Sequence, residues 1–438
     1  MLKKIFLVLS LLLLNYCTNN PDPETNIPNP EVSFGTGRII DGYTNHMSFN
    51  NNDSIEVFLN ADSLMENTKV PIFDVNGNIV SNFLADIFPQ QIQENSPWEN
   101  GYGYVATAKF KIKDLKSGLY FIDNKIPFII KPSNQVDAIV LYPSNTINAY
   151  NKNEGYSLYT NPRAHKLSFH RQQNFPRFSL EFFKWVSNFD FGYLCDFDLD
   201  NYQSFTFSDL IIIPGHSEYW SKVARENFDQ FINNGNDAMI LSGNNMWWQI
   251  RYEEEGNVLV CYKDYDLDPV DDLSLKTINW HNPLLDFSII SSIGCDFSNG
   301  GYGLKYDDDG WDGYKIILPE SPIFQGLNLN FGQILSIPTV EYDSAPVLSI
   351  SDSGIPQVDS ESFHKFNLLG FDKSYRGSNK FGTLVIMQKT EESGIIINTA
   401  STDWGNRGLM GKDSLIIKQI TLNMISLLKT NNEVFLEN

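Results

Sequence analysis

Residues that could do chemistry gather at the end of one strongly apolar run. The run Ile211 to Ile213 is followed by Pro214–Gly215 and then by His216 and Glu218. A buried strand that ends in ionisable residues is typical of open α/β sheets, whose sites lie in the crevice beyond the carboxyl ends of the strands. Because His216 and Glu218 are two residues apart, an extended segment would point both side chains the same way. The sequence therefore predicts the edge of an active site here.

Two more strand-like runs end in polar residues. Val136 to Pro143 is followed by Tyr150 and Tyr159, and Ala238 to Gly243 is followed by Asn244. The carboxyl ends of parallel strands lie at one edge of a sheet, so these side chains can meet His216 and Glu218 there. The two tyrosines would lie on opposite faces of a continuous strand, but the NKNEG stretch between them is expected to be a loop that folds them together.

The elements that must position these residues alternate after Pro132. Strand-like runs and helical patterns follow one another, which indicates an α/β domain with a mostly parallel sheet covered on both faces. The expected strands are 136–143, 209–215 and 238–243, and the expected helices are 180–189, 220–234 and 414–429. We expect this α/β domain to span residues 134–432, with a tail at 433–438.

The preceding stretch, residues 32–133, has a different texture. Short runs of alternating apolar and polar residues are broken by Asn, Gly and Pro, as in SIEVFLNA (Ser54 to Ala61). This pattern predicts an antiparallel β-sandwich of the immunoglobulin-like kind. No cluster of catalytic residue types stands out in it, so its expected role is structural or adhesive.

The amino terminus reads as an export signal. Residues 1–17 combine Lys3 and Lys4 with an apolar run, Ile5 to Leu14, that is too short to span a bilayer. The ending LNYC resembles a bacterial lipoprotein cleavage site, although Tyr16 stands where a small residue is usual. That resemblance predicts a lipid anchor at Cys17 and a Pro/Asn-rich tether at 18–31; an ordinary secretory signal is the alternative. Either interpretation predicts an exported protein, held at the cell envelope or else periplasmic or secreted.

Charge and cysteine content restrict the function classes. With 53 acidic and 32 basic residues the net charge is −21, a field that repels phosphate backbones and disfavours nucleic acid as a partner. The three remaining cysteines, Cys195, Cys261 and Cys295, are widely spaced without metal-ligand spacing, so we expect buried thiols, with one disulfide plus a free thiol as the alternative. The sequence is compatible with an oligomer but does not specify one.

Several motifs in order resemble one family. NAYNKNEGYSLY (148–159), PGHSEYW (214–220) and LSGNNMWW (241–248) are similar to the large (beta) subunit of N,N-dimethylformamidase, and TVEYDS (339–344) and TDWGNRGL (402–409) support the likeness. The resemblance covers nearly all of residues 135–430. It implies a glutamine-amidotransferase-like (flavodoxin-like) α/β fold and a mononuclear Fe(III) that cleaves a C–N bond of a linear amide.

Carried over residue by residue, the resemblance places the iron ligands at Tyr150, Tyr159 and Glu218. It places His216, Asn244 and Glu341 beside them as candidate catalytic residues. Phenolate and carboxylate are hard oxygen donors that suit Fe(III), and open coordination positions would admit water and a substrate carbonyl. One departure from the family is Glu154-Gly155-Tyr156 in place of a Gly-Gly pair, which adds a carboxylate and a phenol beside the site.

Each of these residues also has a structural interpretation. The tyrosines could be packing residues, Glu218 a negative charge at a helix start, His216 a hydrogen-bonded structural histidine, and Asn244 a turn residue or helix cap. Two functions consequently stay open. One is an iron-dependent amide hydrolase acting on a small-molecule amide, and the other is a catalytically silent cell-surface protein that binds a glycan or another ligand.

Overall fold

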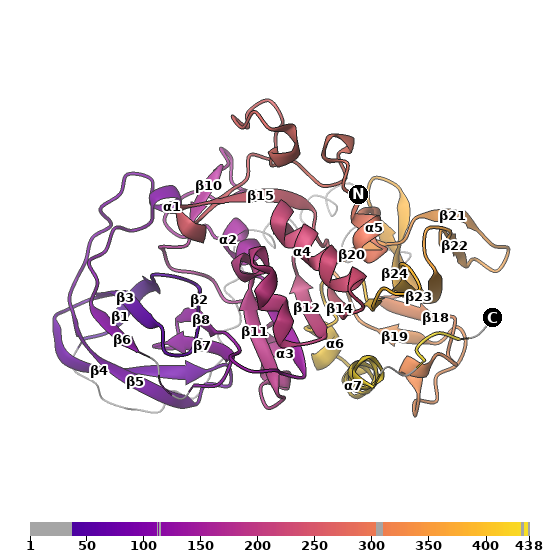
Figure 1. Cartoon of the computed structure of the whole chain (residues 1–438), viewed down its shortest axis with the longest axis horizontal. Coiled ribbons are helices and arrows are strands. Elements are labelled where there is room, and N and C mark those ends of the chain that lie inside the picture. Colours follow the sequence, from indigo (N-terminus) through magenta and orange to yellow (C-terminus); the bar gives the residue numbers. More distant parts are fainter. Residues whose placement is uncertain (1–36, 112, 114, 304–309, 431–432, 437–438) are drawn as a thin grey trace, which may run out of the picture. The chain divides into compact units, whose positions relative to one another are not determined.

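Strands dominate the structure, which is a computed structural model that describes residues 37–111, 113, 115–303, 310–430 and 433–436. They form several sheets accompanied by a few helices (Figure 1). These residues belong to one compact unit, Gly37–Asn438. The expected export signal (1–17) with Cys17, the tether (18–31) and residues 32–36 lie outside the described residues.

Two small sheets come first and share one core. We call them, with their connections, the front sheets, residues 37–131. One contains β1 (Ile39–Thr44), β3 (Ser54–Ala61) and β6 (Ala108–Lys111); the other has the order β2 (Ser48–Phe49), β8 (Ile126–Ile130), β7 (Gly118–Ile122), β4 (Met65–Asp74) and β5 (Ile79–Ile87). Along β3 every second residue is buried, and these side chains pack against Ile122, Phe128 and Ile130 of the other sheet. The period-two pattern of the sequence thus produces two sheets packed face to face.

The largest sheet begins with five parallel strands. Their order is β11 (Phe191–Cys195), β9 (Ala138–Tyr142), β12 (Leu210–His216), β14 (Asp237–Gly243) and β25 (Ile395–Asn398). The expected strands 136–143, 209–215 and 238–243 are confirmed as β9, β12 and β14. All three are buried along their whole length, which explains their continuous apolar runs.

The same sheet continues with antiparallel strands, so the expectation of a mostly parallel sheet is wrong for its second half. The order there is β24 (Asn379–Gln388), β23 (Lys365–Tyr375), β17 (Asp296–Tyr302) and β20 (Glu341–Ser344), with β18 (Gly313–Ile316) and β19 (Ile334–Ser336) attached to β23. For β23 and β24 the cause is the short connection between them, where Gly377 has φ +72°. A connection this short can only join antiparallel strands.

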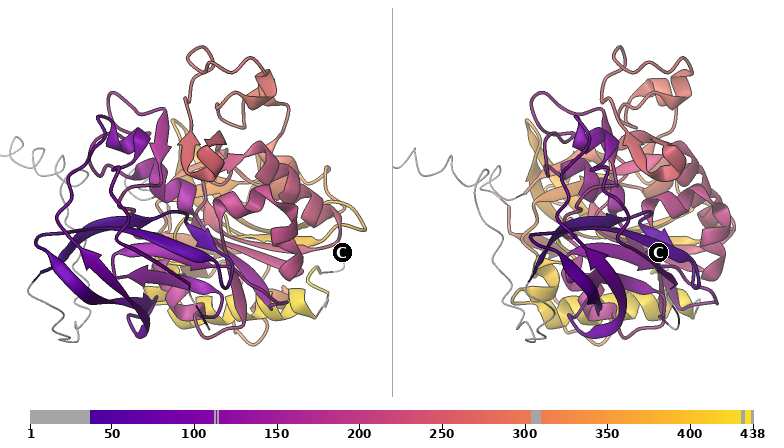
Figure 2. Two further views of the ribbon diagram at one scale, coloured as in Figure 1. Left: turned by 60° about the vertical axis from the view of Figure 1, so that its left-hand side comes forward. Right: turned by 90° about the vertical axis from the view of Figure 1, so that its left-hand side faces the viewer.

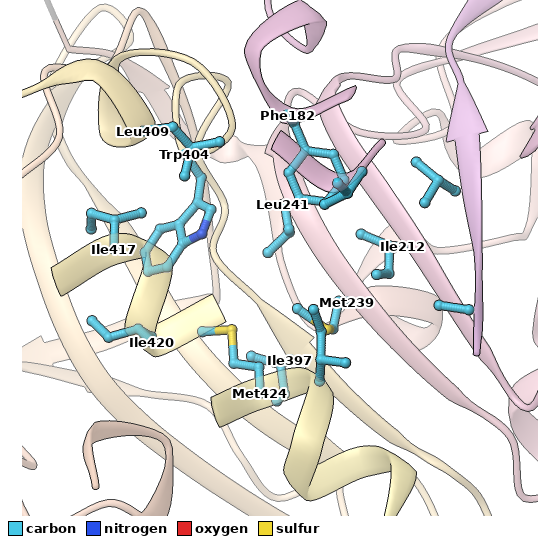
Figure 3. Packing of buried hydrophobic residues seen from close by; sticks show 14 of the residues in the cluster. Phe182, Ile212, Met239, Leu241, Ile397, Trp404, Leu409, Ile417, Ile420 and Met424 are labelled. Carbon is cyan, nitrogen blue, oxygen red and sulfur yellow. The ribbon is translucent and has the colours of Figure 1, made fainter. Parts of the chain in front are cut away.

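Helices cover both faces of this sheet, and alternate residues of each strand face opposite sides. On one face, α3 (Leu180–Val186) and α7 (Ser414–Lys429) pack on Ile212 and Met239; Figure 3 shows Ile417, Ile420 and Met424 of α7 against this layer. On the other face, α4 (Lys222–Asn233) packs on Ile211 and Ile240. Figure 2 shows α7, which belongs to the first face, in yellow along the lower side of the view. The helix expected at 414–429 is confirmed.

The other two expected helices are shorter than predicted. The helix expected at 220–234 starts at Lys222, because residues Tyr219–Ser221 form β13 and the Ser221 hydroxyl accepts a hydrogen bond from the Ala224 N–H at 2.9 Å. A side chain that satisfies a free N–H in this way marks the helix start. The helix expected at 180–189 ends at Val186.

A four-stranded sheet stands beside the parallel strands. Its order is β10 (Lys166–Ser168), β16 (Val258–Val260), β15 (Trp248–Glu253) and β13 (Tyr219–Ser221). The remaining helices and strands are α1 (Pro97–Asn100), α2 (Ser144–Tyr150), α5 (Ile289–Ile293), α6 (Arg407–Met410), β21 (Val347–Ile350) and β22 (Pro356–Val358). Short 3-10 helices lie at Asp196–Asp200, Tyr202–Phe207, Glu254–Gly256, Leu273–Leu275, Pro283–Leu285 and Pro322–Phe324.

Cysteines 195, 261 and 295 are free and buried, which confirms the expectation of buried thiols over a disulfide. Within the described ranges, none of the helices combines the length and apolar character that a bilayer crossing requires.

Candidate functional site

Four segments meet where the parallel strands end. Helix α2 follows β9 and ends with Tyr150, β12 ends with His216, Asn244 follows β14, and β20 begins with Glu341. Strand β20 approaches closely because Gly243 has no side chain: a Cβ there would lie 2.6 Å from the carbonyl oxygen of Glu341. The strand ends and the start of β20 therefore bring their polar residues to one place.

Glu218 is the centre of this cluster. Its carboxylate accepts hydrogen bonds from the Tyr150 hydroxyl at 3.0 Å, from the Tyr159 hydroxyl at 2.7 and 2.8 Å, and from Trp248 Nε1 at 3.0 Å. The Glu218 N–H donates to Thr146 Oγ1 at 2.9 Å, and the residue is only 2% exposed. The three side chains that donate to this buried carboxylate are thus all aromatic.

The two tyrosines lie side by side, as the loop between them predicted. Their rings stack with centroids 4.0 Å apart. Tyr150 is 38% exposed and Tyr159 is 41% exposed, although both hydroxyls end on buried Glu218. The rings therefore form part of the surface while their oxygens reach inward, which gives the cluster a solvent-facing side.

His216, Asn244 and Glu341 form a second group against Glu218. His216 Nε2 lies 3.3 Å from Glu341 Oε2 and 3.6 Å from Glu218 Oε2. The Asn244 amide donates to Glu341 Oε2 at 3.0 Å. Two buried atoms here, His216 Nε2 and Asn244 Oδ1, have no hydrogen-bond partner among the described residues. Unsatisfied buried polar atoms are uncommon and mark places where a further group can bind.

The pKa shifts agree with this arrangement. Burial raises the pKa values of Tyr150 and Tyr159 well above the usual phenol value, and the charge of Glu218 adds to the effect. Burial alone would lower the pKa of His216, but the neighbouring Glu341 charge raises it overall. Burial likewise would raise the pKa of Glu341, and His216 lowers it overall. These directions favour protonated phenols and a charged His216–Glu341 pair.

The oxygens around Glu218 could hold a hard cation. Each of the two phenol oxygens lies within 3.0 Å of the Glu218 carboxylate, so the donor set is the hard one that Fe(III) prefers. A bound cation lowers the pKa of a coordinating group and would displace the phenol protons. No group of three or more His, Cys, Asp or Glu residues in the described part of the chain is arranged for a metal ion; the set around Glu218 is of another kind, because two of its side chains are phenols.

The structure brings all six predicted site residues together, and it adds neighbours that the sequence reasoning missed. The Tyr219 hydroxyl donates to the Tyr159 hydroxyl at 2.7 Å. Lys263 places its ammonium 3.7 Å from the ring centroid of Tyr159 and 4.7 Å from that of Trp248. Tyr219 and Trp248 lie inside two of the quoted motifs, so the family resemblance could have identified them as neighbours of the site. Lys263 follows β16 and lies in none of the quoted motifs, so the sequence reasoning had no sign of it.

Comparisons with known proteins address the family and the fold. The family described as N,N-dimethylformamidase beta subunit-like, C-terminal, matches residues 85–413, a range that includes all six site residues. A solved structure described as a ThuA-like protein from Bacteroides uniformis is similar at 10% identity over 70% of this chain and 97% of that chain, with a TM-score of 0.33. A comparison with curated proteins gave no match.

Proposed function

Because the chain belongs to the N,N-dimethylformamidase beta subunit-like family, we propose that it is a hydrolase that cleaves the C–N bond of a linear amide. The observation that carries the proposal is the convergence of the Tyr150 and Tyr159 hydroxyls on the buried carboxylate of Glu218. These three side chains would hold one Fe(III). When bound, the ion would polarise the amide carbonyl and acidify a water molecule.

The neighbouring residues would handle protons. The reaction adds water across the amide bond, so one proton must leave the water and one must reach the departing amine nitrogen. His216 and Glu341 form a pair 3.3 Å apart in which Nε2 of His216 has no hydrogen-bond partner among the described residues. Such a pair can accept the proton from water and pass it to the amine. The amide nitrogen of Asn244 donates to Glu341. Its amide oxygen, which has no hydrogen-bond partner among the described residues, would orient the substrate.

The scaffold and location form part of the same proposal. We take the parallel strands with their helices as a glutamine-amidotransferase-like domain and the front sheets as immunoglobulin-like. We also propose that the protein is exported and anchored through a lipid on Cys17. Globomycin sensitivity of its processing, with Cys17→Ser as the control, would test the anchor.

The metal decides between the hydrolase and the silent binding protein. We would purify the full-length protein, measure iron, and record visible spectra of the wild type, Tyr159→Phe and Tyr202→Phe. Tyr202 is a matched control because its hydroxyl is also hydrogen-bonded, accepting from Asn234 at 2.8 Å. Bound iron with a tyrosinate absorption band that only Tyr159→Phe removes or shifts is the expected result. A colourless protein that takes up no iron on reconstitution would refute the mechanism and favour the binding protein.

A further inference from the structure

The segment that carries both tyrosines has little regular structure of its own. We call residues 150–159 the tyrosine turn. After α2 it contains no helix or strand, and its local hydrogen bonds are those of short turns, such as Leu158 N–H to Ala149 O at 3.1 Å and Tyr159 N–H to Ser157 Oγ at 3.1 Å. A site residue is held in place only when its surroundings fix it. The 2.7 Å contact from Tyr159 to Glu218 therefore needs support from outside the turn.

One support is Arg171, which is fully buried. Its guanidinium donates to Asn148 Oδ1 at 2.9 Å, to Asn153 O at 3.1 Å and to Asn151 O at 3.3 Å. Burial lowers its pKa to about 10, so it stays charged at neutral pH. Arg171 thus ties together the backbone on both sides of Tyr150 from inside the protein.

The other support is Trp98, which belongs to the front sheets. It lies in α1, within the connection between β5 and β6, and α1 packs beside β10 (Figure 1). The indole lies directly on Gly155: a Cβ at Gly155, whose φ is +139°, would be 2.2 Å from Trp98 Cε3. The ring also makes an edge contact with Tyr156 at a centroid distance of 4.6 Å. Trp98 therefore covers the middle of the tyrosine turn.

The front sheets also hold the segment that carries Arg171. Tyr102 N–H donates to His170 O at 2.9 Å, Gly42 N–H donates to Gln172 Oε1 at 3.2 Å, and Gln172 Nε2 donates to Lys125 O at 3.0 Å. Both supports of the tyrosine turn consequently depend on residues 37–131. This differs from a tethered adhesive module, which would touch the catalytic domain only through a linker.

We propose that the front sheets are a structural part of the candidate site, with Trp98 as the positioning residue that holds the tyrosine turn so that Tyr159 reaches Glu218. This inference rests on the proposed function for its catalytic meaning. It extends the structural role expected for residues 32–133 to the candidate site. The proposal also explains two residues of the Glu154-Gly155-Tyr156 segment. Gly155 leaves room for the Trp98 indole, and Tyr156 makes a further contact with the same ring.

The test compares full-length wild type with Trp98→Ala, Trp98→Phe and Trp185→Ala. Trp185 is a matched control, since it is also a partly buried tryptophan that packs on other aromatic rings, Phe182 and Phe189, outside the tyrosine turn. Backbone hydrogen exchange of residues 151–159 is measured in iron-free protein. We expect Trp98→Ala to speed this exchange by about tenfold or more, Trp98→Phe to restore most of the protection, and Trp185→Ala to leave it unchanged.

A second readout uses iron-loaded protein at equal iron content. Trp98→Ala should shift the tyrosinate band and speed iron loss, which a general loss of stability would not do selectively. Unchanged exchange in 151–159 together with an unchanged band would overturn the proposal. If the wild type binds no iron, the hydrolase function fails, while the exchange data still decide whether Trp98 holds the turn. The two failures are thereby distinguishable.

Discussion

Replacing Arg171 by Met should destabilise the protein strongly even without iron. The substitution removes a buried guanidinium that donates to Asn148 Oδ1 at 2.9 Å and to Asn153 O at 3.1 Å. Hydrogen bonds to a charged donor contribute about 1.5 to 3 kcal/mol each, and Asn148, one of the acceptors left behind, is fully buried. The two short bonds therefore predict a loss of about 3 to 6 kcal/mol in the free energy of unfolding.

Urea titrations of iron-free wild type and variants, followed by tryptophan fluorescence, measure this loss as a lower midpoint at constant slope. Arg177→Met is the control, because Arg177 is exposed and its guanidinium lies over the Phe178 ring at 5.3 Å; its effect should stay within about 0.5 kcal/mol. Arg171→Lys keeps the charge but not the planar fork, so its loss should lie between the two. An Arg171→Met midpoint equal to that of the wild type would refute the reasoning that this guanidinium holds the tyrosine turn.

Three further predictions test other parts of the chain. Burial would raise the pKa of Asp268, but hydrogen bonds from Arg251 and Thr277 lower it to about 2. The stabilisation from this lowered pKa is present above the unfolded value of 3.8 and is lost as the pH falls. Between pH 5 and 3, thermal melts should therefore show that the free energy of unfolding falls by about 1 kcal/mol more in the wild type than in Arg251→Gln. Equal losses in the two proteins would contradict this prediction. Lys263→Met should move the tyrosinate band of iron-loaded protein to longer wavelength, because a positive charge over the Tyr159 ring is removed; Lys276→Met, whose ammonium faces Tyr265 instead, should not. Ile420→Ala in the core of Figure 3 should cost about 2 to 5 kcal/mol of unfolding free energy, whereas Leu415→Ala at the 80% exposed position of the same helix should change the urea midpoint little.

The parts of the fold that the sequence predicted are those governed by local pattern. Strands β9, β12 and β14 are continuous apolar runs because both of their faces are covered, and α7 has a regular apolar stripe. The antiparallel half of the large sheet was not predicted. Its direction is set by the connection around Gly377 and by pairing between distant strands such as β17 and β20, neither of which leaves a periodic signal.

The candidate site divides in the same way. His216 and Glu218 could be placed on one side of an extended segment from their spacing, and their side chains do meet at 3.6 Å. Lys263 could not be placed, because it comes from the loop after β16, far along the chain from the Tyr159 ring that it faces. Glu341 was placed by family resemblance alone, since it comes from the antiparallel half of the sheet. The catalytic and metal-binding roles of the six predicted site residues stay predictions.

The position of Glu218 explains why this site needs parts from so much of the chain. A buried carboxylate loses its hydration and must be compensated by donors or by a cation. Here the donors are phenols and an indole, with the ammonium of Lys263 behind the rings and His216 Nε2 at 3.6 Å. The two tyrosines come from one connection, which is held by Arg171 and Trp98, and the other groups come from separate segments of the chain. A change in the front sheets should therefore alter the environment of Glu218 as directly as a change in the parallel strands, which is the opposite of what a detachable module would do.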